Sequence, residues 1–275
     1  MEIFIKMVAL MGVIGLVFGV LLAFANKKFA IEMNPLIHTI EEILPKGQCG
    51  ACGFPGCQAY AEAVVLDKDV APDLCIPGKA EVARKVAELT GKQADVVESR
   101  VAKVRCSQPA GKSKLKYDYS GIKDCLAASL LQQGPKACKY GCIGLGTCER
   151  HCPFDAIKLN EDGLPIVDEK KCTGCGKCEE VCPNHVMAMI PIGAHVENIC
   201  SSHDPGAVKR KYCAQPCIGC GICKKACPHG AIEIANGLAV IDKHICMEKC
   251  DDPVCVDKCP TKSLQLLREE VRNKS

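Results

Sequence analysis

The sequence lacks tryptophan and has few other aromatic residues. Among its 275 residues there is no Trp, and aromatic side chains make up only 4% of the chain. Large aromatic side chains therefore supply little of the core. The net charge of +3 is small and evenly spread, which excludes the strongly basic surface of a nucleic-acid-binding protein. The chain also lacks a Rossmann glycine fingerprint and a phosphate-binding loop, so we expect no independent catalytic site on it.

Cysteine, in contrast, is abundant. The chain contains 24 cysteines, about a tenth of its residues. A secreted disulfide framework would have irregular spacing, whereas "CTGCGKCEEVCP" and "CIGCGICKKACP" repeat one spacing. Metal–thiolate bonds are the alternative, because the free energy of metal binding becomes free energy of folding. The cysteines therefore indicate metal centres that organise the fold.

An apolar run near the N-terminus predicts a membrane anchor. The stretch "MVALMGVIGLVFGVLLAFA", residues 7–25, has no charged residue and nearly matches the hydrocarbon thickness of a bilayer. Lys27 and Lys28 follow it, which favours a cytoplasmic location for the rest of the chain. "AFA" at 23–25 resembles a signal-peptidase site, but export would take 24 thiols into an oxidising compartment. We therefore expect an uncleaved, single-pass anchor.

The first four cysteines form a group of their own. Their spacing is C-x2-C-x4-C-x17-C, at Cys49, Cys52, Cys57 and Cys75. A helix around "HTIEEIL" is expected to end at Pro45 and Gly47, a second to begin at Cys57, and a third to end at Gly91. A loop would thus carry three thiolates, and the chain would return to deliver the fourth.

Beyond residue 105 the chain repeats itself. "ACKYGCIGLGTCERHCPFDAIKL" aligns without a gap with "YCAQPCIGCGICKKACPHGAIEI", so that Cys138 corresponds to Cys213. Each copy continues into two short strands around a turn, with Asn236-Gly237 a strong hairpin signal. Each copy then ends in a second run of cysteines. Two copies of one module are therefore expected.

The runs from Cys172 and from Cys217 have the exact spacing of bacterial ferredoxins, and the run from Cys246 to Cys259 is a looser variant. In C-x2-C-x2-C-x3-C-P the first three thiolates bind one [4Fe–4S] cluster and the fourth binds its neighbour. This crossover rule predicts three complete ligand sets, which are Cys152, Cys172, Cys175 and Cys178; Cys217, Cys220, Cys223 and Cys259; and Cys227, Cys246, Cys250 and Cys255.

One set departs from the repeat. Cys142, Cys148 and Cys182 lack a fourth partner, because Leu145 stands where the second module has Cys220. The nearest replacement is Cys138, which we expect to complete this set. Together with the N-terminal group this gives five [4Fe–4S] clusters. A sixth is left open, with its candidate ligands Cys106, Cys125, Cys200 and Cys213, and Cys125 and Cys138 could exchange roles.

These patterns define an α+β fold with a single N-terminal transmembrane helix, a small four-cysteine iron–sulfur domain and two tandem two-cluster ferredoxin-like modules. The expected divisions are an anchor, a connector, the N-terminal domain, the two modules and a charged tail, over residues 1–26, 27–48, 49–105, 106–195, 196–263 and 264–275.

Nearly the whole chain resembles the family of B subunits of the Rnf electron-transport complex, in the longer form with two ferredoxin-type modules. The resemblance rests on the single anchor, on "CGACGFPGCQAYAEAV" with Cys75, and on "GCIGLGTCERHCPFDAI". It implies an electron-relay subunit of a translocase at the cell membrane. Reduced soluble ferredoxin would be the donor, other Rnf subunits the partners, and NAD the final acceptor, coupled to export of sodium ions or protons.

Two alternatives are weighed against this interpretation. The chain could relay electrons in another membrane complex, such as a hydrogenase or a quinone-linked dehydrogenase, or it could be an iron–sulfur sensor. A sensor needs an output domain, which this chain lacks. For the acidic donor we expect a basic docking surface. The candidates lie in two basic stretches, Lys112, Lys114 and Lys116, and Lys209, Arg210 and Lys211 with Lys224 and Lys225 nearby.

Overall fold

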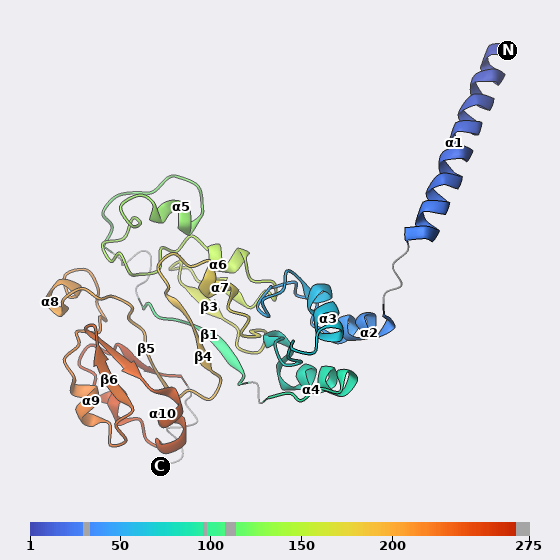
Figure 1. Ribbon diagram of the computed structural model, residues 1–275. Helices are drawn as coiled ribbons and strands as arrows, with labels where there is room; N and C mark the ends of the chain where they lie inside the picture. The colour runs from blue at the N-terminus through green and yellow to red at the C-terminus, as the bar shows by residue number, and fades with distance from the viewer. Residues whose placement is uncertain (30–33, 96–97, 108–113, 268–275) are drawn as a thin grey trace.

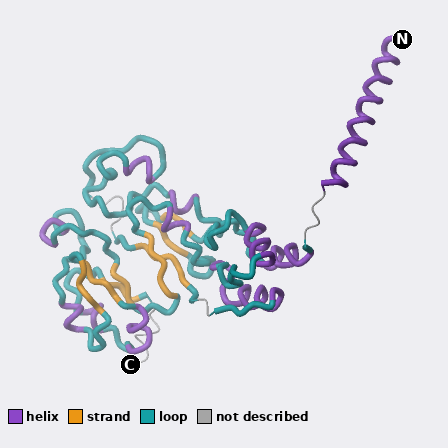
Figure 2. The backbone as a smooth tube through the Cα atoms, in the orientation of Figure 1, coloured by secondary structure: helices purple, strands orange, loops and turns teal. Residues whose placement is uncertain are grey.

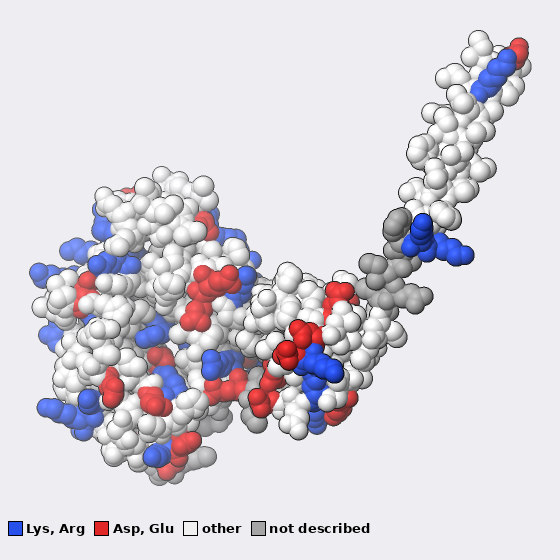
Figure 3. All heavy atoms as spheres, viewed as in Figure 1, with Lys and Arg blue, Asp and Glu red and all other residues white. Residues whose placement is uncertain are grey.

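A computed structural model describes residues 1–29, 34–95, 98–107 and 114–267 of the chain. Its first element is helix α1, Glu2–Phe29, which lies apart from the folded body (Figure 1). Within Glu2–Lys28 this helix contains an 18-residue window with a mean hydropathy of 2.7, none of which is buried against the protein. Its charged residues lie only near the two ends (Figure 3). An exposed apolar helix of this length fits a membrane anchor, as the sequence predicts.

The N-terminal iron–sulfur domain is built from helices. Helix α2, Pro35–Ile43, starts at Asn34, whose Oδ1 accepts from the Leu36 N–H at 3.0 Å. Helix α3 spans Cys57–Leu66, the short 3-10 helix η1 Ile76–Gly78, and helix α4 Lys79–Thr90. Gly91 ends α4 in the left-handed conformation, with φ +67°. All three predicted helices are confirmed.

Each ferredoxin-type module consists of two antiparallel strand pairs. In module 1, β1 (Arg100–Val104) pairs with β4 (Met187–Pro191), and the hairpin joins β2 (Ile157–Leu159) to β3 (Pro165–Val167). In module 2, β5 (Val196–Asn198) pairs with β8 (Leu264–Leu266), and the hairpin joins β6 (Ile232–Ala235) to β7 (Leu238–Ile241). In both modules the first strand thus pairs with the last.

Short helices carry or flank the cysteine runs. Module 1 contains α5 (Cys125–Ser129), α6 (Thr147–Arg150) and α7 (Lys177–Glu180). Module 2 contains α8 (Gly206–Lys209), α9 (Ile222–Ala226), α10 (Lys243–Lys249) and α11 (Val254–Asp257). Loops join these elements over most of both modules (Figure 2).

The strand pairs extend both modules beyond the expected boundaries. Strand β1 precedes residue 106 and pairs with β4, so the sheet of module 1 begins at Arg100. Strand β8 follows residue 263 and pairs with β5, so the expected tail, 264–275, begins with a strand that belongs to module 2. Residues 268–275 lie outside the described residues. The flanking strands contain no cysteine, and the cysteine runs on which the expected boundaries rest could not reveal them.

Thiols form a large part of the buried interior. In module 2, Cys217, Cys223, Cys246 and Cys255 pack among small aliphatic residues such as Ile232 and Leu264. Module 1 shows the same arrangement around Cys172 and Cys178. Because so few aromatic side chains are available, the space between the hairpins and the short helices is bounded by cysteines, which positions them for a shared ligand.

Candidate iron–sulfur centres

Cys49, Cys52, Cys57 and Cys75, the N site, line one cavity, as the spacing of this group predicts. Cys49 and Cys52 lie on the loop before α3, Cys57 is the first residue of α3, and Cys75 directly precedes η1. Gln48 fixes the loop, since its Oε1 accepts from the Cys57 N–H at 2.8 Å. The loop therefore folds back onto the start of α3, with its thiols turned toward the cavity.

In module 1, the proximal site consists of Cys152, Cys172, Cys175 and Cys178, which line a second cavity. Cys152 arrives from the other cysteine run of the module, as the crossover rule requires. The N–H of Ala102 on β1 donates to Cys172 Sγ, and the N–H of Ala156 donates to Cys152 Sγ, both at 3.4 Å. Backbone N–H groups thus point at thiols that would be negative when they bind iron.

The N site and the module-1 proximal site touch each other. The thiols of Cys49 and Cys175 lie within hydrogen-bonding reach, which lowers the pKa of Cys49 to about 6 and raises that of Cys175, because only one of the two takes the negative charge. The ring of Phe154 lines the proximal cavity and lies against Gly47 at the edge of the N site. Phe154 is thus shared by the edges of the two sites.

Module 2 contains two four-thiol groups. The module-2 proximal site consists of Cys217, Cys220, Cys223 and Cys259, which line one cavity. The module-2 distal site consists of Cys227, Cys246, Cys250 and Cys255, with Cys255 close to the other three. Gly219 (φ +67°) lets the proximal loop pass the hairpin, because a Cβ there would lie 2.9 Å from the Gly237 oxygen. Cys220 is exposed, whereas the other cysteines are buried or half-buried.

The remaining site of module 1 differs from the expectation. The module-1 distal site consists of Cys125, Cys142, Cys148 and Cys182, which line one cavity with apolar residues such as Ile143 and Val186. Cys138, the expected fourth member, lines a different cavity. Cys125 takes its place because the segment before the repeat folds over the position that Leu145 leaves without a thiol.

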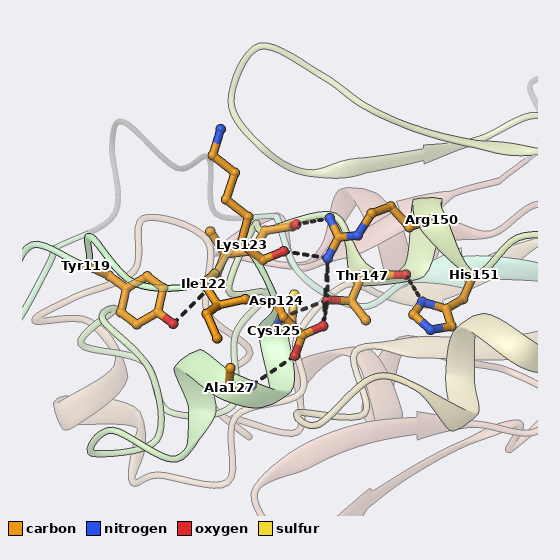
Figure 4. Close-up of polar contacts among 10 residues, drawn as sticks. Tyr119, Ile122, Lys123, Asp124, Cys125, Ala127, Thr147, Arg150 and His151 are labelled. Carbon is orange, nitrogen blue, oxygen red and sulfur yellow. Dashed lines mark hydrogen bonds and ion pairs between the residues drawn. The ribbon is translucent and has the colours of Figure 1, made fainter.

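A polar network holds Cys125 in that position (Figure 4). The Oγ1 of Thr147 on α6 accepts from the Cys125 N–H at 2.7 Å and donates to Asp124 Oδ2 at 2.9 Å. Arg150 donates to the Lys123 oxygen at 2.5 Å and to the Leu145 oxygen at 2.8 Å. Hydrogen bonds from the Ala127 N–H and Thr147 hold the pKa of Asp124 below its usual value. Helix α6, which carries Cys148, thus also positions the fourth thiol.

A sixth group lies between the modules and is called the junction site. Cys106, Cys138, Cys200 and Cys213 line its cavity. Three of these residues were expected in the sixth set, with Cys125 as the fourth. In the structure Cys138 lies at the junction and Cys125 at the module-1 distal site, which is the exchange of roles that the repeat allowed.

Burial makes these thiols poor nucleophiles but suitable iron ligands. Loss of hydration raises the pKa of Cys142, Cys178 and Cys255 to about 12 each, because a thiolate removed from water without a counter-cation is unfavourable. Iron supplies that cation when it binds. Four thiols, N–H donors to sulfur and apolar walls therefore fit a [4Fe–4S] cluster.

The expected docking stretches require one correction. Lys209 is fully buried, and its Nζ donates to the Cys217 oxygen at 2.7 Å and to the Gly237 oxygen at 3.0 Å. It therefore cannot contribute to a docking surface. Arg210, Lys211, Lys224 and Lys225 are exposed, as are Lys114 and Lys116, while Lys112 lies outside the described residues.

Comparison with known families identifies the class of the folded domains. Residues 44–77 match the family described as "Putative Fe-S cluster", residues 139–186 the "4Fe-4S dicluster domain", and residues 216–233 the "4Fe-4S binding domain". The chain is therefore an iron–sulfur protein that carries [4Fe–4S] clusters.

Curated relatives identify the particular family. The chain is 54% identical to the B subunit of the proton-translocating ferredoxin:NAD(+) oxidoreductase complex of Clostridium ljungdahlii, over 96% of this chain and 92% of the relative. It is 43% identical to the B subunit of the Na(+)-translocating ferredoxin:NAD(+) oxidoreductase complex of Acetobacterium woodii, over 92% of this chain and 75% of the relative. It is 39% identical to the B subunit of the ion-translocating oxidoreductase complex of Methanosarcina acetivorans, over 96% of this chain and 99% of the relative. The chain belongs to the family of B subunits of the Rnf complex, which confirms the resemblance and the predicted class of iron–sulfur electron relay.

Proposed function

We propose that this chain accepts electrons from reduced soluble ferredoxin and passes them to other subunits of a membrane-bound, ion-translocating ferredoxin:NAD oxidoreductase. The contact of Phe154, which lines the module-1 proximal cavity, with Gly47 of the N site carries this proposal, because it sets four-thiol sites of two different domains against each other. The names of the relatives, which include ferredoxin and NAD, support the donor and the final acceptor. The nicotinamide site would lie on another subunit.

Five [4Fe–4S] clusters are assigned to the N site and to the proximal and distal sites of the two modules. When bound, each cluster exchanges one electron with its neighbour. The protein supplies thiolate ligands, donates N–H groups to several of the sulfurs and keeps water from most of them. The two sites within each module exchange their last cysteine, which holds neighbouring clusters at a fixed separation.

Electrons enter at module 2 in this proposal. Cys220 is the exposed thiol of the proximal site, and Lys224 and Lys225 on α9 lie between Cys223 and Cys227, one ligand of each module-2 site. An acidic donor would be attracted to these lysines and would approach the proximal site at the exposed Cys220. The electrons leave at the N site, in the domain that follows the anchor.

The iron–sulfur domains are assigned to the cytoplasmic side of the cell membrane. Lys27 and Lys28 in the last turn of α1 support this orientation, because basic residues that flank a span are retained in the cytoplasm. Soluble ferredoxin is then on the same side as module 2.

The test compares two charge-reversal variants of the full-length protein, purified anaerobically in detergent. Lys224→Glu/Lys225→Glu changes the proposed docking surface, and Lys114→Glu/Lys116→Glu is the matched control in module 1. We expect reduction by ferredoxin, followed by loss of visible absorbance, to slow about tenfold in the first variant at low salt and to recover in part at high salt. Reduction by dithionite and the iron content should match the wild type. Equal rates of reduction by ferredoxin in the two variants would contradict the docking assignment.

A further inference from the structure

Lys136 is a buried lysine of module 1, with only 4% of its surface exposed. Its Nζ is enclosed by protein and has no hydrogen-bond partner among the residues that the structure describes. An ammonium group that is removed from water is strongly destabilising unless an anion or a set of acceptors compensates it. The surroundings of Lys136 indicate which group supplies this compensation.

Backbone pairing holds Lys136 in place. Lys136 and Leu115 face each other in an isolated antiparallel bridge. Beside this bridge the Ala137 N–H donates to the Lys114 oxygen at 2.7 Å. These contacts close the loop that carries Cys125. The segment that delivers the fourth thiol of the module-1 distal site thus also fixes the position of Lys136.

The ammonium group of Lys136 reaches the loop between Cys142 and Cys148, two ligands of the distal site. Gly144 lies in this loop and lines the distal cavity together with both cysteines. A Cβ at Gly144 would lie 3.8 Å from Lys136 Nζ and 3.1 Å from the Gly163 oxygen, at the turn of the β2–β3 hairpin. Burial raises the pKa of the Cys142 thiol to about 12, and the charge of Lys136 opposes this rise. Lys136 therefore lies where its charge acts on the thiols of this site.

Module 2 brings a buried lysine to the same feature from a different position in the sequence. Lys209 donates to the oxygens of Cys217 and Gly237, and thus joins the ligand loop to the turn of the β6–β7 hairpin. The two lysines are not repeat equivalents, because the gap-free alignment of the modules pairs Lys136 with Lys211, which is exposed. Two carbonyl oxygens accept from Lys209, whereas Lys136 has no such partner among the described residues.

The thiols of the distal site can supply the partner that Lys136 lacks. Four thiolates around a [4Fe–4S] cluster give the site a net negative charge, and reduction adds one more negative charge. A nearby cation favours the reduced form, because its Coulomb attraction grows with that charge and buried charges are poorly screened. Net charge is one of the quantities that set the reduction potential of such a site.

We propose that Lys136 is the counter-cation of the module-1 distal cluster and raises the reduction potential of that cluster. One electron is added to the site in this step, Lys136 keeps its proton, and no bond forms or breaks. In the proposed relay, electrons that arrive from module 2 are thereby drawn toward module 1. The inference rests on the proposed assignment of a cluster to the module-1 distal site, which is tested separately below.

The test replaces Lys136 by methionine in the full-length, anaerobically purified protein, because Lys136→Met removes the charge and nearly conserves the volume. Lys211→Met is the matched control, since it changes the aligned but exposed lysine of module 2. Electron paramagnetic resonance during a potentiometric titration should show one cluster of Lys136→Met shifted. At the wild-type midpoint its ratio of reduced to oxidised form should be about tenfold lower, which corresponds to a midpoint about 59 mV more negative. The control should titrate like the wild type, and wild-type midpoints for every cluster of Lys136→Met would overturn the proposal.

A second variant identifies the cluster that shifts. The signal that shifts in Lys136→Met should be the one that Cys148→Ala removes. A shift in a signal that Cys148→Ala retains would overturn the assignment of Lys136 to the distal site. If Cys148→Ala loses no iron, the distal cluster itself is contradicted and the proposal falls with it, whereas a retained cluster with a wild-type midpoint in Lys136→Met contradicts only the role of the lysine.

Charge is separated from packing by Lys136→Arg, which keeps the positive charge. We expect its midpoints and iron content to be close to those of the wild type. Loss of iron from Lys136→Met alone would support the proposal, because only the uncharged variant then fails to hold the anionic cluster. A shift in Lys136→Arg as large as that in Lys136→Met, or an equal loss of iron from both variants, would give Lys136 a packing role and overturn the proposal.

Discussion

Modules 1 and 2 have the same strand pairs but obtain one thiol in different ways. In module 2 the loop itself provides Cys220, which is exposed. In module 1 the equivalent position is Leu145, and Cys125 reaches the cavity from a segment that module 2 lacks. That segment also covers the module-1 distal site. The comparison shows that the same strand pairs can bound a site with an exposed thiol, Cys220, or a site whose fourth thiol comes from an added segment.

The largest expected effect comes from removing the unusual ligand. Cys125→Ala should cost the module-1 distal cluster, about four irons per chain, whereas adding Leu145→Cys should restore them by giving module 1 the pattern of module 2. Iron and sulfide analysis of anaerobically purified protein measures both. Full iron content in Cys125→Ala would show that Cys138, rather than Cys125, is the fourth ligand. If Leu145→Cys does not restore the iron, the loops of the two modules differ in shape.

A smaller effect is expected from the network that positions Cys125. Thr147→Val removes the acceptor of the Cys125 N–H and should destabilise the folded, cluster-loaded protein by about 1 kcal/mol, because a part-buried donor loses its partner. The visible absorbance of the clusters, followed during heating, would show the loss at a lower temperature.

Module 2 provides the matched control for this prediction. The repeat equivalent of Thr147 is Ile222, which is 42% exposed. Ile222→Thr should leave the temperature of cluster loss unchanged. If the two variants behave alike, the network has no role specific to Cys125.

The sequence predicted the regular part of the cluster sites because local spacing determines it. A C-x2-C-x2-C-x3-C-P run places three thiols on one loop and sends the fourth to the neighbouring site, as Cys182 does in the structure. Cys125 could not be assigned in this way, because it lies on a segment without a repeat counterpart. Only the folded structure places Cys125 beside Cys142, Cys148 and Cys182.

Two further features required the structure. The equivalence of Cys138 with Cys213 was visible in the repeat, but the bridge between Cys106 and Cys200 that completes the junction was not. The basic run at 209–211 suggested an exposed surface, yet Lys209 turns inward to two backbone carbonyls. A basic run in a sequence does not show that its side chains are exposed, because a lysine can be buried when carbonyl oxygens accept hydrogen bonds from its ammonium group.

All 24 cysteines fall into six four-thiol sites, and we propose one [4Fe–4S] cluster for each. Native mass spectrometry of the full-length protein, released anaerobically from detergent, counts bound clusters as whole numbers. We expect a fully loaded species with six [4Fe–4S] clusters and no zinc. A fully loaded species with five clusters, or with five clusters and one zinc ion, would contradict it.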